Sequence, residues 1–137
     1  MCIIVPTYNN IQELRYIWSI ESLLQQEYTN YRAIIIDDNS KDNTVNATGL
    51  YLKWRGADPS KFILIEGKKR RTALENIYYG VHKYCDYGQI FMIFDGDDEL
   101  FGRQGFKVIN SLYQRHKYYL IYSEFISYNS INKRNIL

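Results

Sequence analysis

The sequence predicts an α/β fold, an αβα sandwich built around a mainly parallel sheet. Short apolar runs alternate along the chain with segments of helical periodicity, which is the pattern of βαβ units. The runs at residues 33–36 and 90–94 are apolar on consecutive positions, as expected of parallel strands covered on both faces. The length of 137 residues favours one domain, so we expect residues 1–137 to form a single unit.

Each strand is expected from an apolar run, and each helix from the amphipathic segment between two runs. The first helix is expected to begin at Asn10, with Glu13 completing a capping box, and the third at Thr72, with Glu75 in the same role. The expected strands are residues 2–5, 33–36, 62–65, 90–94 and 118–122.

Composition excludes several classes of protein. There are 17 Lys and Arg against 15 Asp and Glu, and a net charge of +2 is too small for a nucleic-acid footprint. No apolar run approaches the roughly 20 residues of a membrane span. Cys2 and Cys85 show no metal or disulfide spacing, so we expect buried free thiols in a reducing compartment. The first strand leaves no room for a signal peptide, which predicts a cytoplasmic protein.

Three polar segments follow predicted strands directly. Residues 6–9 follow the first strand, Asp37 and Asp38 follow the second, and residues 95–98 follow the fourth. In an open α/β sheet, ligands bind beyond the carboxyl ends of the parallel strands. We therefore expect the three segments to converge on one ligand site.

The acidic segment after the fourth strand has the composition of a divalent-metal site. Asp95, Asp97 and Asp98 offer the carboxylate oxygens that Mg²⁺ and Mn²⁺ prefer, and such ions usually take further ligands from water and phosphates. Gly96 lets the backbone turn sharply between the carboxylates. A solvated acidic turn is the ordinary alternative, because Asp-x-Asp also occurs by chance.

The other polar segments suggest contacts to a nucleotide. Asp38 accepts hydrogen bonds only, so it can select a base N–H or a ribose hydroxyl, and one aspartate of the Asp37–Asp38 pair is expected to cap the next helix. The basic run at residues 68–71 either contacts a diphosphate or is a solvated surface. Arg71 is the preferred candidate because it lies beside the helix start at Thr72.

Four motifs in this order resemble the family 2 glycosyltransferases. The resemblance implies a GT-A fold, a nucleotide-diphosphate sugar donor (most often a UDP-sugar), Mn²⁺ or Mg²⁺, and inversion at the anomeric carbon. The motifs are Val5-Pro6-Thr7-Tyr8-Asn9, Ser22-Leu23-Leu24-Gln25-Gln26, Ile36-Asp37-Asp38-Asn39-Ser40 with Asp42 and Thr44 behind it, and Phe94-Asp95-Gly96-Asp97-Asp98.

The resemblance also implies roles for individual residues. Asp38 matches the aspartate that meets the base, Asp95 lies nearer the ribose, Asp97 is the better metal ligand, and Asp98 is a second candidate ligand. Residues 72–76 resemble a segment that reads Ala-Arg-Asn in the family, which moves the arginine here to position 70 or 71. The remaining nucleotide-sugar contacts are expected from Pro6, Thr7, Tyr8, Asn9, Arg71 and Gly96.

In the family the chain continues into an acceptor-binding half that holds the general base. We therefore expect this chain to be incomplete, with its catalytic residue unknown and with an unknown glycan, lipid or protein as acceptor. Glu124 is the only late carboxylate, and its surroundings do not recommend it as a base.

Two alternatives remain beside the transferase. The first is a nucleotide-binding module without transfer activity. The second is a phosphoacceptor receiver domain, because residues 34–38 resemble the acidic strand that opens such domains. The complete strand–helix unit that precedes this strand argues against a receiver.

Overall fold

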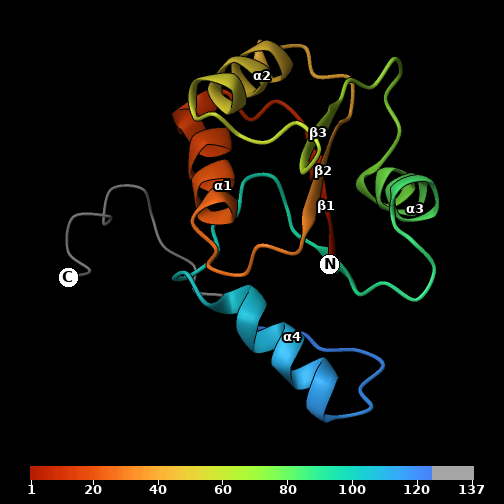
Figure 1. The fold of residues 1–137 in the computed structure, drawn as a ribbon. Coiled ribbons are helices and arrows are strands. Elements are labelled where there is room, and N and C mark those ends of the chain that lie inside the picture. The colour runs from red at the N-terminus through yellow and green to blue at the C-terminus, as the bar shows by residue number, and fades with distance from the viewer. Residues whose placement is uncertain (125–137) are drawn as a thin grey trace. The chain divides into compact units, whose positions relative to one another are not determined.

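A parallel sheet forms the centre of the fold, as Figure 1 shows. Within the described part of the chain its strands are β1 (Cys2–Thr7), β2 (Arg32–Asp37), β3 (Phe62–Ile65) and β4 (Phe91–Ile93), in the order β3-β2-β1-β4. Every pairing is parallel, with Cys2 opposite both Arg32 and Phe91. The predicted parallel α/β sheet is therefore confirmed.

The structure is a computed structural model that describes residues 1–124. The chain divides into two compact units, Met1–Lys107 and Val108–Leu137. The first unit holds the whole described sheet. The expectation of a single domain over residues 1–137 stays a prediction.

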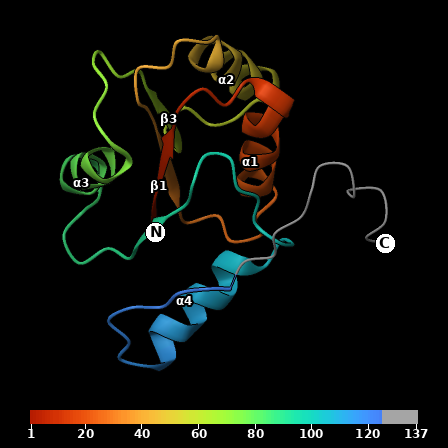
Figure 2. The same cartoon turned by 180° about the vertical axis from the view of Figure 1, so that it is seen from behind.

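Helices cover both faces of the sheet in the first unit (Figures 1 and 2). Helices α1 (Arg15–Leu24) and α2 (Thr44–Trp54) lie on one face, and α3 (Ala73–Tyr84) lies on the other. Close packing of α3 depends on Gly80, where a Cβ atom would lie 2.8 Å from Cδ1 of Ile36 and 3.0 Å from Cδ1 of Ile4. The three layers are those of the predicted sandwich.

Burial differs between the central strands and β4. All of β1 is buried, and β2 is buried except at Arg32, which confirms the expectation for residues 33–36. In β4, by contrast, Phe91 and Ile93 are 50% and 49% exposed. The continuous apolar run at residues 90–94 predicted cover on both faces, and this is wrong because β4 is an edge strand of the described sheet.

The two predicted capping boxes have different outcomes. Thr72 is the N-cap of α3, and its hydroxyl accepts a hydrogen bond from the Glu75 N–H at 3.2 Å, as predicted. Asn10 does not cap α1. A 3₁₀ turn, η1 (Gln12–Leu14), intervenes, and α1 begins only at Arg15 without a side-chain cap. Asn10 instead joins two loops at the sheet edge.

The second unit begins within α4 (Gly105–Arg115), the last helix of the described residues. Residues 118–122 form no strand, so the predicted fifth strand is wrong. Their aromatic and β-branched side chains favour extended backbone, but a strand also needs a partner, and no described strand pairs with them. Among the described residues, no helix is long and apolar enough to cross a membrane.

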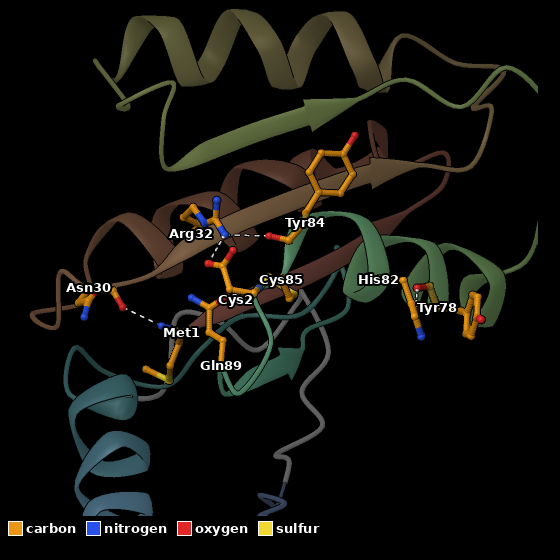
Figure 3. Close-up of a disulfide and its surroundings, with 10 residues drawn as sticks. Met1, Cys2, Asn30, Arg32, Tyr78, His82, Tyr84, Cys85 and Gln89 are labelled. Carbon is orange, nitrogen blue, oxygen red and sulfur yellow. Dashed lines mark hydrogen bonds and ion pairs between the residues drawn. A yellow bond between two sulfur atoms is a disulfide. The ribbon is translucent and has the colours of Figure 1, made fainter.

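Cys2 and Cys85 form a disulfide, so the expectation of free thiols is wrong (Figure 3). The chain returns through α3 to the start of β1, which brings together two Cα atoms that are 83 residues apart in sequence to within 5.6 Å. Nearby, the Arg32 guanidinium donates to the Tyr84 carbonyl at 2.8 Å and contacts Asp86 at 3.0 Å. This cross-linked corner lies at the amino ends of the strands.

Candidate functional site

Three loops converge at the carboxyl edge of the sheet. Thr7 and Asp37 end β1 and β2 in register, and the Asp38 N–H donates to the Thr7 carbonyl at 2.9 Å. The Gly96 N–H donates to the Pro6 carbonyl at 3.0 Å. The structure thus brings together the three polar segments that the sequence placed after separate strands.

Two glycines let these loops approach one another closely. A Cβ atom at Gly96 would lie 2.9 Å from both the Pro6 carbonyl oxygen and Cβ of Thr7. A Cβ atom at Gly67 would lie 2.3 Å from the Asp37 carbonyl oxygen. Only glycine fits where backbone packs on backbone in this way. The loop between β3 and α3 is therefore a fourth wall of the site.

Asn9 and Asn10 tie the loop after β1 to the loop after β2. The Asn9 N–H donates to the Ser40 hydroxyl at 2.9 Å, and its side-chain oxygen accepts from the Lys41 N–H at 2.8 Å. The Asn10 N–H donates to the buried Thr44 hydroxyl at 2.8 Å. Asn9 has a φ of 51°, in the left-handed region that asparagine tolerates better than most residues. These contacts fix the backbone on which Thr7 and Tyr8 are carried.

Asp37 closes the loop after β2 and does not cap a helix. Its carboxylate accepts from the Ser40 N–H at 2.8 Å and from the Ser40 hydroxyl. Asp42 serves the start of α2 instead, accepting from the N–H and the hydroxyl of Thr44. The expectation that Asp37 or Asp38 caps the next helix is wrong, because the turn at residues 37–43 uses Asp37 internally.

Asp38 is buried like Asp37, with 5% of its surface exposed, and it faces the loop before α3. Its Oδ1 accepts from the Arg71 N–H at 2.7 Å and from the Asn76 side-chain amide at 3.0 Å. Its Oδ2 lies 3.4 Å from Nε of Arg70. Asn76 was not among the predicted site residues. The available signal was a polar side chain on the face of α3 that carries Ile77, Gly80 and Tyr84.

The two arginines of the basic loop point to different aromatic rings. The Arg70 guanidinium carbon lies 3.6 Å from the centroid of the Tyr8 ring, on the loop after β1. That of Arg71 lies 4.8 Å from the ring of Tyr79, on α3. Arg71 therefore reaches Asp38 through its backbone, while Arg70 brings its side chain to both Asp38 and Tyr8. The preference for Arg71 as a ligand contact stays a prediction.

The acidic turn after β4 concentrates negative charge at the same edge. Asp95, Asp97 and Asp98 are exposed, while Gly96 between them is buried. Desolvation, followed by the nearby Asp97 and Asp95 carboxylates, raises the pKa of Asp98 above its usual value. The Asp97 carboxylate lies 3.3 Å from Nη1 of Arg15, at the start of α1. A cation brought to this turn would relieve the mutual repulsion of the carboxylates.

The carboxylates of this turn fit a metal site whose other ligands come from substrate phosphates. No group of three or more His, Cys, Asp and Glu side chains within residues 1–124 is arranged to hold a metal ion. Mg²⁺ and Mn²⁺ are commonly held by one or two carboxylates together with substrate phosphates. Asp97, with Asp95 or Asp98, could supply that number of protein ligands.

The chain is similar in sequence and in fold to known glycosyltransferases. The model of the family described as glycosyl transferase family 2 matches residues 2–135. The structure of S. aureus TarS 1–349 in complex with UDP-GlcNAc is similar, with 19% identity and a TM-score of 0.69, over 85% of this chain and 31% of that chain. The mannosyltransferase PcManGT from Pyrobaculum calidifontis, in complex with GDP-Man and Mn²⁺, has 24% identity and a TM-score of 0.61, over 74% of this chain and 28% of that chain.

The two structural similarities concern the fold, and the chain spans less than a third of the length of either protein. The receiver-domain alternative finds no support in them. The family match extends over nearly the whole sequence and includes all the loops at the carboxyl edge. The chain belongs to glycosyl transferase family 2 and has its GT-A fold.

Proposed function

We propose that the chain binds a nucleotide-diphosphate sugar, with a UDP-sugar as the donor, together with Mn²⁺ or Mg²⁺, as part of a metal-dependent glycosyltransferase. The acceptor is a glycan, a lipid or a protein, and the sugar is transferred with inversion. One observation carries the proposal. A buried aspartate, a half-buried tyrosine and a cluster of carboxylates meet at the carboxyl edge of one parallel sheet.

Asp38 and Tyr8 form the proposed base subsite. Asp38 is buried and held by Arg71 and Asn76, so its carboxylate is fixed in place before a ligand arrives. A carboxylate selects N–H and O–H groups because it only accepts hydrogen bonds. Tyr8 is half-buried beside it and offers a flat ring for stacking. Pro6, Thr7 and Asn9 keep this loop in position along the nucleotide.

Asp97, with Asp95 and Asp98, forms the proposed diphosphate end of the site. When bound there, a divalent ion supplies positive charge that stabilises the departing diphosphate. The three carboxylates bind and orient that charge, and Gly96 keeps the turn against β1. Arg15 already contacts Asp97 and stands beside the same phosphates.

A nucleotide-binding chain without transfer activity is the second candidate. The acids at the described sheet edge already have partners: Asp37 binds Ser40, Asp38 binds Arg71 and Asn76, and Asp97 contacts Arg15. Asp95 and Asp98 are assigned to the proposed metal, so none of these aspartates is assigned to take a proton from an acceptor. If simple acceptors stimulate the release of UDP from a UDP-sugar, the chain transfers the sugar and this second candidate is wrong.

The nucleotide site is tested by thermal shift with UDP- and GDP-sugars, with and without Mn²⁺. A ligand at a hundredfold its dissociation constant adds about 2.7 kcal/mol to stability, which raises the melting temperature by on the order of 8 °C for a chain of this size. Asp97→Asn should abolish the part of the shift that needs Mn²⁺. Asp38→Asn should weaken nucleotide binding with or without Mn²⁺.

The matched control is Asp86→Asn, an exposed acid that pairs with Arg32 near the opposite end of the strands. It should leave the shifts unchanged. If Asp97→Asn binds UDP and Mn²⁺ as tightly as the parent chain, the metal assignment is wrong. A thermal shift with GDP-sugars but not with UDP-sugars would support the nucleotide site and contradict the choice of UDP.

A further inference from the structure

We infer that Arg70 is an internal occupant of the base subsite, whose side chain fills the place of the nucleobase until a nucleotide displaces it. The inference rests on the proposed nucleotide site and assigns a specificity-determining role within it. Three observations support it: the saturation of one oxygen of Asp38, the cover on the Tyr8 ring, and the exposure of the Arg70 side chain.

Arg70 contacts Oδ2 of Asp38, the carboxylate oxygen to which no other described residue donates a hydrogen bond. Oδ1 accepts from the Arg71 N–H at 2.7 Å and the Asn76 amide at 3.0 Å, which uses both of its lone pairs. Oδ2 faces Nε of Arg70 at 3.4 Å. An N–H from a base must therefore reach Oδ2, the position that Arg70 holds.

The same side chain covers the ring on which a base would stack. The Arg70 guanidinium carbon lies 3.6 Å from the Tyr8 centroid, a separation typical of flat groups in contact. A guanidinium plane and a nucleobase use an aromatic face in the same way. Hydrogen bonding at Asp38 and stacking on Tyr8 are thus both occupied by one residue.

Arg70 can leave without a rearrangement of the loop. Its side chain is 59% exposed, and an ion pair and a cation–π contact at such an exposed position are weak. The backbone next to it is fixed, because the Arg71 N–H is bound to buried Asp38. Displacement therefore needs rotation of the Arg70 side chain alone.

Competition of this kind discriminates between ligands. A ligand that offers both a flat ring and an N–H donor replaces both contacts of Arg70. Pyrophosphate or a sugar phosphate replaces neither and leaves Arg70 in place. The occupant thus raises the threshold for every ligand that enters the base subsite, and it lowers affinity for the nucleoside part of the donor.

Calorimetric titration with uridine, guanosine and pyrophosphate tests this role. Arg70→Ala should bind the nucleoside that the site accepts about three- to tenfold more tightly than the parent chain, since two weak exposed contacts no longer compete. Its affinity for pyrophosphate should not increase. Lys69→Ala is the control, because it removes one exposed positive charge from the same loop and should not tighten nucleoside binding.

A readout without ligand checks the contact itself. In the free protein, Arg70→Ala should shift the ring resonances of Tyr8, which are assigned by their absence in Tyr8→Phe. Arg70→Lys, which keeps the charge but loses the planar group, should give an intermediate gain in affinity. Circular dichroism establishes that each variant is folded.

The outcomes separate this inference from the proposed function. Weaker or unchanged nucleoside binding by Arg70→Ala, in a parent chain that binds UDP, overturns the role of Arg70 alone. A parent chain that binds no nucleoside diphosphate overturns the proposed function, and the inference with it. Tighter binding of both pyrophosphate and nucleoside would mean a general effect of charge and would also overturn the inference.

Discussion

Asp98 carries an unfavourable charge in the folded protein, because desolvation and the neighbouring Asp97 and Asp95 raise its pKa. The charged form therefore destabilises the fold at pH values above the folded pKa, and this cost disappears as the pH falls through it. Asp98→Asn should raise the free energy of unfolding at pH 7, by less than about 1 kcal/mol at this exposed position. The gain should vanish near pH 3.

Urea denaturation at the two pH values measures this difference. Asp58 gives a control of opposite sign, because hydrogen bonds from the Ser60 side chain and backbone lower its pKa. Asp58→Asn should lower stability at pH 7 and have little effect at pH 3. Equal effects of Asp98→Asn at both pH values would show that repulsion in the acidic turn is not the cause.

Single residues were predictable from sequence where their partners are local. Thr72 caps α3 by accepting from the N–H three residues further on, and that spacing is visible in the chain. Asn10 looked the same, but its side-chain amide donates to Thr7 and its N–H to Thr44, 34 residues away, and α1 begins only at Arg15. The choice between Arg70 and Arg71 likewise depends on Tyr8, a residue of another loop.

At the scale of elements, Glu21 joins α1 to α2. Desolvation raises the pKa of its carboxyl, but hydrogen bonds from Arg55 and Tyr51 outweigh it and leave the pKa below its usual value. The contact therefore adds stability above the unfolded pKa, and this stability is lost as the pH falls through the folded pKa. Glu21→Gln should cost about 1 kcal/mol at pH 7 and little at pH 3.

A double-mutant cycle with Arg55→Met, followed by urea denaturation, isolates the contribution of the pair. The coupling should be present at pH 7 and should fall as the solution is acidified. Coupling that is independent of pH would show that the charge of Glu21 is not its cause.

A helix or strand was predictable from sequence where its apolar pattern is compatible with only one type of secondary structure. Residues 33–36 and 62–65 lie in strands because a short run between helical segments fits little else. Residues 118–122 carry similar side chains without forming a strand, since pairing depends on a neighbouring strand that the pattern does not specify. The exposed face of β4 was missed because an apolar run does not show whether a helix covers the strand.

At the scale of the whole molecule, the disulfide between Cys2 and Cys85 closes a covalent loop that contains most of the first unit. For residues 83 apart, the chain-entropy estimate is a stabilisation of about 4–5 kcal/mol. Dithiothreitol should therefore lower the melting temperature of the parent chain. The double variant Cys2→Ala, Cys85→Ala should melt at a lower temperature that dithiothreitol does not change.

The same bond bears on the predicted compartment. Disulfides persist in oxidising surroundings, and cytoplasmic thiols are kept reduced. The cytoplasmic location stays a prediction, and it requires that thiol titration of freshly prepared protein finds two free thiols. A parent chain that melts identically with and without dithiothreitol would show that the bond is not formed under those conditions.

The bond also changes what a protease can do to this protein. The loop of residues 68–71 is basic and largely exposed, so it offers trypsin a run of cleavage sites. This loop lies inside the covalent ring from Cys2 to Cys85, while the acidic turn after β4 lies outside it. A single cut in the loop therefore leaves both fragments in one molecule as long as the cysteines stay joined. Such a nicked chain would keep its mass under non-reducing conditions and separate into two pieces only when the bond is reduced.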